Sequence, residues 1–113
     1  MTAPTVHDDP IYLLLYNENI DEFNRRHNEA KTALLRGGVY RNLDLRNMNA
    51  EGLDFRDAYF RGADLRGIDF RTANLEGASM IEAKISGCYF PKELSPDEIR
   101  LSVMAGTRLR YNT

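Results

Sequence analysis

Apolar and polar residues follow a fixed period of five from Ala33 to Lys92. The third residue of every five-residue block is apolar or aromatic, and the first residue is apolar or small. Most second and fourth positions are polar, and Gly, Asn or Asp occupies most fifth positions. The twelve blocks follow one another without insertion and read ALLRG, GVYRN, LDLRN, MNAEG, LDFRD, AYFRG, ADLRG, IDFRT, ANLEG, ASMIE, AKISG and CYFPK.

This period predicts a coil with corners, because it fits neither an α-helix nor a continuous strand. Two inward positions two residues apart suit a short extended segment, since a strand returns to the same face every second residue. Gly, Asn and Asp at the end of a block tolerate the positive φ of a corner. Four such sides close a coil, so twelve blocks predict three coils stacked ~4.8 Å apart. The alternative, a run of short hairpins, would not need the same five-residue phase throughout.

The blocks ALLRG, LDFRD, ADLRG and ANLEG resemble the A(D/N)LXX motif of the pentapeptide-repeat family. This resemblance implies a right-handed quadrilateral parallel β-helix. The expected fold class is therefore an all-β solenoid of about three coils, with short α-helical caps at both ends. The flanks DPIYLLLYNENIDEFNRR and YFPKELSPDEIRLSVMAGTRLRY resemble a short bacterial subgroup of the family with helical flanks, and this second resemblance implies no particular activity.

The flanking sequences predict helices before and after the repeats. We expect one domain with three parts, which are an N-terminal helical cap at about 9–32, the β-helix at 33–92, and a C-terminal helix and tail at 93–113. Asp9 before a proline indicates the start of one helix, and Asn19 with Glu22 forms a capping box that starts a second helix ending near Glu29. Such helices would cover the core and the strand edges exposed at the end of a solenoid.

The C-terminal flank carries a stronger helix signal. Ser95 and Glu98 form a capping box around a proline at the first helical position, and Gly106 ends the predicted helix. Three apolar or aromatic residues of this flank are predicted to make contacts, namely Ile99, Val103 and Tyr111. A cap on the last coil is the simpler interpretation. A homodimer contact through the same flank is the alternative, and the two do not exclude each other.

Composition limits the classes of function and the compartment. The chain has 113 residues, 28 % of them charged, and a net charge of −2, which argues against a nucleic-acid binder and against a strongly acidic mimic. The single cysteine excludes an internal disulfide, and the polar N-terminus MTAPTVHDDP has no signal-peptide pattern. No apolar run approaches membrane-spanning length. We therefore predict a cytoplasmic protein that does not bind a membrane.

No catalytic, cofactor or metal site is predicted. The two histidines, His7 and His27, have no Cys or carboxylate at the spacing of metal ligands. Cys88 falls at an inward first position beside Phe90, where it should be a small buried apolar group. Asp recurs at second positions because these positions favour short polar groups. A convex rod also offers no concave pocket for acid–base chemistry. The prediction is a protein that is not an enzyme.

Arginine at the fourth position is the most unusual outward feature. Residues twenty apart stack on the same side, so three sides carry stacked arginine pairs. The simpler interpretation is that these arginines pair with Asp and Glu of adjacent rows and keep the rod soluble. The alternative is a surface for an anion or an acidic partner. Six residues make up this candidate partner surface, namely Arg41, Arg46, Arg61, Arg66, Tyr59 and Ile81.

The predicted function is a non-catalytic protein-interaction or scaffold module whose protein partner is unidentified. The family's best-known activity belongs to rods that resemble B-form DNA and act on DNA gyrase, so the resemblance allows a DNA-mimic regulator of a topoisomerase as the alternative. Residues 33–92 carry nine basic and eight acidic side chains, whereas a DNA mimic needs acidic sides. Three coils would span about 14 Å, well short of one duplex turn of ~34 Å.

Overall fold

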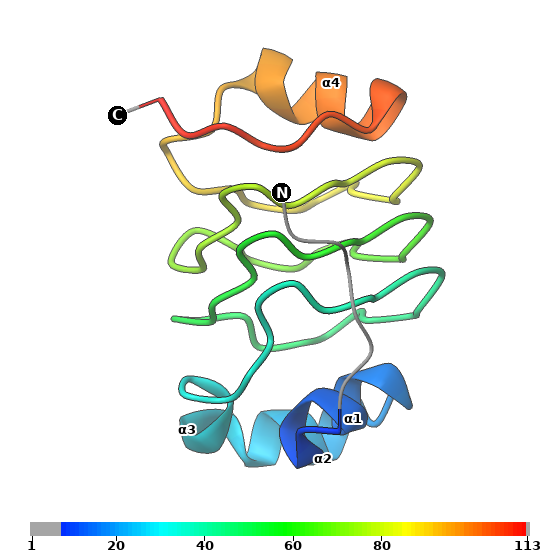
Figure 1. Ribbon diagram of the computed structural model, residues 1–113, viewed down its shortest axis with the longest axis vertical. Helices are drawn as coiled ribbons and strands as arrows, with labels where there is room; N and C mark the ends of the chain where they lie inside the picture. The colour runs from blue at the N-terminus through cyan, green and yellow to red at the C-terminus, as the bar shows by residue number, and fades with distance from the viewer. Residues whose placement is uncertain (1–7, 113) are drawn as a thin grey trace.

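A computed structural model describes residues 8–112, in which helices close both ends of a stack of coils (Figure 1). Three short helices precede the stack and one follows it, namely α1 (Pro10–Tyr16), α2 (Ile20–Arg25), α3 (His27–Ala30) and α4 (Pro96–Ala105). The first three lie together at one end of the long axis, and α4 lies across the other end. The longest extent of the molecule is 34 Å. None of the four helices is long and apolar enough to span a bilayer.

Parallel bridges join residues that are twenty positions apart, so four five-residue blocks make one coil. One column of bridges runs from Val39 to Tyr59 to Ser79 and therefore passes through three coils. Every bridged residue within the repeats occupies the second position of its block. The other parallel bridges are Asp44–Asp64, Asp54–Asn74, Asp64–Lys84 and Asp69–Tyr89. This twenty-residue repeat matches the predicted coil.

The bridges are isolated, whereas we expected a short strand on every side. Within residues 8–112 no continuous strand is present. The reason is the short distance between corners. Each block enters through a tight turn, as where the N–H of Ala58 donates to the carbonyl of Phe55 at 3.1 Å. One residue per side is then left to form a ladder pair before the chain turns again.

Positive φ at the fifth position makes the corners. From Gly37 to Gly87 every fifth position has positive φ except Thr72. A corner N–H normally donates to a backbone carbonyl of the next coil, as from Gly62 to Ile81 at 2.9 Å. At the β-branched exception the Oγ1 of Thr72 replaces that carbonyl and accepts from the N–H of Gly52 at 3.1 Å. The hydroxyl of the departing corner residue Thr72 thus satisfies the corner N–H of Gly52 in the preceding coil.

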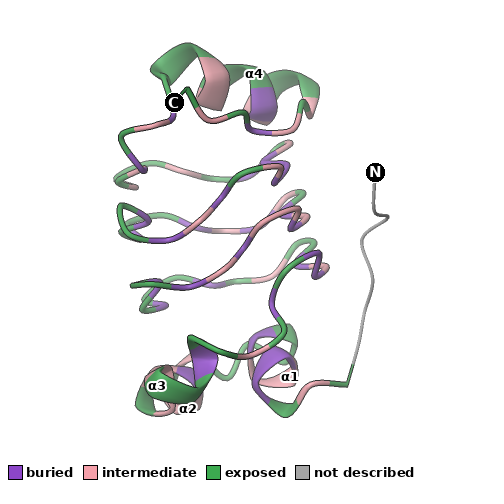
Figure 2. Cartoon of the chain, turned by 60° about the vertical axis from the view of Figure 1, so that its left-hand side comes forward, coloured by how far each residue is buried: buried purple, intermediate pink, exposed green. Residues whose placement is uncertain are grey.

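The third positions form the core, as the pattern predicted. All of them from Leu35 to Met80 are buried, and Figure 2 shows buried segments recurring along each coil. Aromatic rings meet at its centre, where Phe60 stacks on Tyr40 with ring centroids 5.1 Å apart and lies edge-on to Phe55 at 5.4 Å. The last two third positions, in the final coil, are half-buried.

The N-terminal helices pack on the first coil. The carboxylate of Asp9 caps α1 by accepting from the N–H groups of Ile11 and Tyr12, and it also accepts from Leu34 of the first block at 3.2 Å. The Tyr12 hydroxyl donates to the carbonyl of Val39 at 3.0 Å. These contacts connect the helix start to the repeats and close the lower end of the core.

The second predicted helix is interrupted at Arg26. Asn19 caps α2 by accepting from the N–H of Glu22, as expected. The backbone of Arg26, at φ −98° and ψ 31°, then leaves the helical region and separates α2 from α3. The Arg26 guanidinium donates forward to Glu29 at 2.8 Å. The predicted helix is therefore two short helices.

The C-terminal helix begins and ends where the sequence predicts. Ser95 Oγ accepts from the N–H of Glu98 at 3.1 Å, and Gly106 adopts φ +77° at the end of α4. The capping box itself is incomplete. The carboxylate of Glu98 accepts instead from the backbone N–H of Arg110 at 3.0 Å and from its guanidinium at 2.9 Å. This ion pair connects the tail to the start of α4.

The segment after α4 pairs with the open edge of the third coil. Arg108 forms an antiparallel bridge with Ser79, and the N–H of Leu109 donates to the carbonyl of Ala78 at 2.8 Å. The helix contributes as well, because the buried Oγ of Ser102 accepts from the N–H of Met80 at 2.9 Å. The segment after α4 thus serves as an edge segment on the third coil.

Candidate functional site

An Asp two residues before an Arg forms the same ion pair on three sides of the coil. In the best-defined case, Asp64 Oδ1 accepts from the backbone N–H and from Nε of Arg66, and Oδ2 accepts from a terminal guanidinium nitrogen at 2.7 Å. We call this arrangement the Asp-x-Arg clamp. Four pairs form it, namely Asp44–Arg46, Asp54–Arg56, Asp64–Arg66 and Asp69–Arg71.

The clamp follows from local geometry. Residues i and i+2 of an extended segment point to the same face, which brings a short carboxylate under a long guanidinium. The pairing is bidentate, the stronger form of this contact. We expected arginines to pair mainly with adjacent rows, and such contacts are secondary, as at 3.5 Å from Arg46 to Asp64. Arg46 and Arg66, two of the predicted partner-surface residues, are therefore already paired with carboxylates of their own blocks.

The clamps lower the pKa of their carboxyl groups. The side-chain hydrogen bond from Arg66 is the largest cause of the lowered pKa of Asp64, which falls to about 2. Arg46 and Arg56 likewise lower the pKa values of Asp44 and Asp54 through side-chain hydrogen bonds. The carboxylate of Asp64 therefore stays charged to more acidic pH than an ordinary aspartate, and the pKa values of Asp44 and Asp54 shift in the same direction.

We predict that replacing Asp64 by Asn reduces the loss of stability in acid. The Asp pKa lies near ~3.9 in an unfolded chain and at about 2 here, so its contribution is present above pH ~4 and is lost as pH falls through about 2. Asn keeps an acceptor for the N–H of Arg66 but cannot titrate. Urea unfolding of both proteins across this range should show their free energies of unfolding converging in acid. The exposed Asp97→Asn is the control, and a difference that stays constant with pH would contradict the assignment.

One side of the coil carries arginines without a clamp. Val39 and Tyr59 occupy the second positions there, two residues before Arg41 and Arg61. The Arg41 guanidinium lies over the Tyr59 ring, 5.5 Å from its centroid, and within residues 8–112 it forms no ion pair. Arg61 has one carboxylate contact, at 3.4 Å to the corner residue Glu82. We call these four residues, Val39, Arg41, Tyr59 and Arg61, the Tyr59 face.

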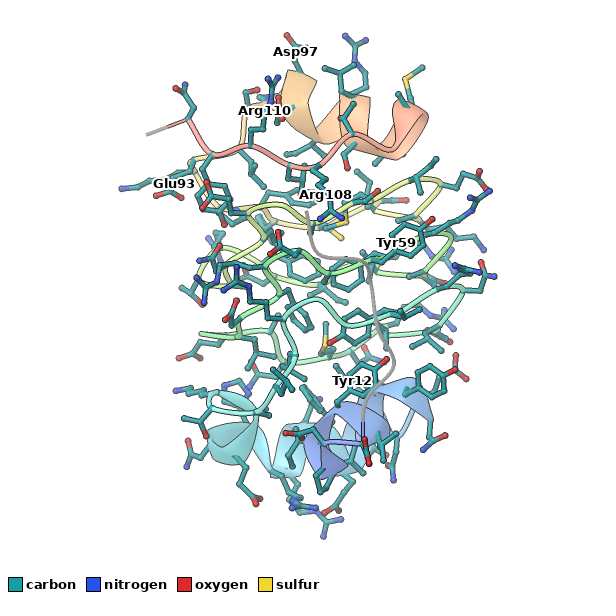
Figure 3. The ribbon with its side chains drawn as sticks, viewed as in Figure 1. Tyr12, Tyr59, Glu93, Asp97, Arg108 and Arg110 are labelled. Atoms are coloured by element: carbon teal, nitrogen blue, oxygen red, sulfur yellow. The ribbon has the colours of Figure 1, made fainter. Side chains whose placement is uncertain are left out.

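Tyr59 lies under Arg41 and also affects the pKa of Arg61. Its side chain is the largest cause of the raised pKa of Arg61, ahead of the charge on Glu82. Figure 3 places Tyr59 between Tyr12 and Arg108 along the long axis of the molecule. Unlike the aspartates on the other sides, Tyr59 brings no carboxylate to the two guanidinium groups, whose positive charge it therefore does not offset.

A hollow with apolar walls adjoins the Tyr59 face toward the N-terminal helices. It is lined by Tyr16, Val39, Arg41 and Leu43. Tyr16, at the end of α1, is 40 % exposed although its neighbour Tyr12 is fully buried, and the two rings lie 5.8 Å apart. The hollow therefore combines aromatic and aliphatic surface with one unpaired guanidinium.

The repeated clamps and the inward third positions give successive blocks the same environment. The family description "Pentapeptide repeats (8 copies)" matches residues 33–67, 41–77 and 54–90, which together span just over half of the chain. The chain belongs to the pentapeptide-repeat family. No curated protein and no solved structure matches this chain.

Ile81 is the remaining predicted surface residue of this pentapeptide-repeat protein, and the C-terminal flank partly covers it. A Cβ added at Gly106 would lie 2.9 Å from Ile81 Cδ1, which shows how closely the end of α4 approaches. Arg108, next to this contact, donates to the carbonyl of Gly77 at 2.8 Å. The apolar side chain of Ile81 is thus matched by a contact within the chain, and we leave it out of the Tyr59 face.

The C-terminal residues predicted to make contacts face the third coil of this pentapeptide-repeat protein. Ile99 and Val103 pack against its core, and the Tyr111 hydroxyl accepts from the N–H of Leu75 at 2.8 Å. The large apolar residues that α4 exposes are Leu101 and Met104, the latter 75 % exposed, and they share one helical face. A homodimer through this flank stays a prediction.

The reactive side chains are half-buried or outside the described residues. His7 lies outside residues 8–112, and both ring nitrogens of His27 are buried without a hydrogen-bond partner. Burial raises the pKa of the Cys88 thiol, whose Sγ donates to the carbonyl of Leu65 at 2.9 Å. Within residues 8–112 no group of three or more His, Cys, Asp or Glu is placed to hold a metal ion.

Proposed function

We propose that this pentapeptide-repeat protein is a non-catalytic interaction or scaffold module built on a right-handed quadrilateral β-helix. Its flat sides would hold outward side chains at fixed spacing for a protein partner in the cytoplasm. The contrast between its sides carries the proposal. Three sides have carboxylates that clamp the arginines of their own blocks, whereas the Tyr59 face presents arginines that are available to a partner.

The backbone network supports a presenting role. Each coil is hydrogen-bonded to its neighbours. For example, the carbonyl of Tyr59 accepts from the N–H of Tyr40 at 2.8 Å, and the N–H of Tyr59 donates to the carbonyl of Gly38 at 2.9 Å. The two helical flanks close the ends of the stack. The backbone positions that carry the outward side chains are consequently fixed before a partner binds, which reduces the entropy lost on association. Solenoids in general bind partners along such extended surfaces.

The topoisomerase alternative has weaker support. A DNA mimic needs rows of unpaired negative charge, whereas Asp44, Asp54, Asp64 and Asp69 each pair with an arginine two residues later. A supercoiling assay with DNA gyrase distinguishes the two proposals. Inhibition or protection at micromolar protein would favour the mimic, and the absence of any effect would remove it.

Capture of partners by matched variants tests the interaction module. The Arg41→Glu/Arg61→Glu variant reverses charge on the Tyr59 face, and the Arg46→Glu/Arg66→Glu variant makes the same change in net charge on a clamped side. Cross-linking in cells followed by quantitative mass spectrometry should recover a partner with the wild type and lose it in one variant only. Circular dichroism must show that both variants are folded.

The same set of captured proteins for the wild type, both variants and an unrelated globular protein would contradict the proposal. Loss of a partner from the clamped-side variant alone would keep the module and move its binding surface away from Tyr59.

A further inference from the structure

We propose that the Tyr59 face binds an acidic segment of the partner protein. Two carboxylates of that segment would pair with Arg41 and Arg61, and a neighbouring apolar side chain would occupy the hollow beside Tyr16. This inference rests on the proposed interaction function and specifies the chemistry of the partner.

Charge complementarity carries the first step. Arg41 and Arg61 are twenty residues apart and so stand on successive coils, about 4.8 Å apart along the stack. Arg41 has no carboxylate partner within the described residues, and Arg61 has a single contact at 3.4 Å to the exposed Glu82. A guanidinium prefers bidentate pairing with a carboxylate. Both guanidinium groups can therefore donate to a carboxylate of a partner without breaking an Asp-x-Arg clamp.

Tyr59 holds the two guanidinium groups without neutralising them. Its ring lies under Arg41, with the guanidinium carbon 5.5 Å from the centroid, and Tyr59 occupies the second position of the block that carries Arg61. On each clamped side a carboxylate does the same positioning and cancels the charge. Replacement of Asp by Tyr thus keeps the arginines ordered and positively charged, which is what recognition of an anion requires.

The hollow beside this face supplies the apolar part of the site. Val39 stands where clamped blocks have Asp, and together with Leu43 and the 40 % exposed Tyr16 it lines a concave surface next to Arg41. An apolar side chain close to the carboxylates would fill it. A polyanion such as single-stranded nucleic acid fits less well, because it needs a longer basic stripe than two arginines provide.

Fluorescence anisotropy with a synthetic probe tests the inference. The probe is a short fluorescein-labelled peptide in which Glu alternates with Leu, and its control has Lys in place of Glu. A labelled oligo-dT of similar length tests the nucleic-acid alternative. Binding of the Glu peptide should weaken as salt increases, because exposed charges are screened.

The sharpest variant builds clamps on this face. Val39→Asp/Tyr59→Asp places a carboxylate two residues before Arg41 and before Arg61, as in the clamped blocks, and should weaken peptide binding about tenfold, a change of about 1.4 kcal/mol. Arg41→Gln/Arg61→Gln should weaken binding to the same degree. Arg46→Gln/Arg66→Gln makes an equal change in net charge on a clamped side and should leave the dissociation constant unchanged.

The inference would be overturned if all three variants bound the Glu peptide as tightly as the wild type does. It would also be overturned if the wild type bound the Lys peptide as tightly as the Glu peptide, or bound oligo-dT more tightly. If the peptide does not bind although cellular capture of a partner depends on Arg41 and Arg61, the partner chemistry is wrong and the interaction module stands. If cellular capture fails for every variant and for the wild type, the proposed function itself fails.

Discussion

Replacing Phe60 by alanine is expected to lower the free energy of unfolding by about 3–5 kcal/mol. Phe60 is fully buried at the centre of the stack, where it packs on Tyr40 of the first coil and against Phe55 and Phe70. A narrow core has little freedom to collapse around the cavity, because hydrogen bonds above and below hold each coil in place. A loss of this size is a large fraction of the stability of a typical domain.

Urea unfolding followed by circular dichroism measures this effect, and Tyr89→Ala is the matched control. Tyr89 is also an aromatic residue of the repeats, but it is 58 % exposed. Its ring contact within residues 8–112 is with the guanidinium of Arg71, whose carbon lies 4.6 Å from the ring centroid. Its removal should cost about 1 kcal/mol or less. Similar losses for both variants would show that the aromatic core does not dominate stability.

Ending the chain at Glu93 is expected to abolish the soluble monomer. Removal of α4 and the tail exposes Met80 and Leu75, which are fully buried. It also leaves the N–H groups of Gly77 and Glu82 without the carbonyls of Leu109 and Val103. An uncovered apolar edge with unpaired backbone groups is a template for aggregation. Light scattering and size-exclusion chromatography should show high-molecular-weight species, and an unchanged monomer would rule out the capping role.

A single substitution provides a graded version of the same test. Ser102→Ala leaves the buried N–H of Met80 without its acceptor at 2.9 Å and should lower the free energy of unfolding by about 1–3 kcal/mol. Ser86→Ala, at an exposed fourth position, should change it by less than about 0.5 kcal/mol. Equal effects of the two substitutions would mean that the contact between α4 and the third coil adds little stability.

Much of the fold is predictable because the repeat is local. Inward packing at Leu45 or Phe70 and positive φ at Asn42 follow from the position of each residue in its block. The starts of α1, α2 and α4 follow from capping residues within the same helical turn. The family match to residues 33–90 agrees with this regularity. The break at Arg26 carries no comparable signal in the sequence.

The candidate site was only partly predictable. Its residues Arg41, Arg61 and Tyr59 were expected at a partner surface, but Arg46 and Arg66 were expected there as well. The clamp separates the two pairs, and its signal is present in the sequence as Asp two residues before Arg. We expected the arginines to pair with carboxylates on neighbouring rows, whereas they pair with those of their own blocks.

The five-residue period is sufficient to predict the coil, its core and its corners, because each of these depends on position within a block and repeats without change. Contacts between the repeats and their flanks depend on residues far apart in the chain. The pairing of Glu98 with Arg110, of Ser102 with Met80, and of Tyr111 with Leu75 follows from how α4 and the tail lie on the third coil. No period encodes that placement, so it emerged only from the packed structure.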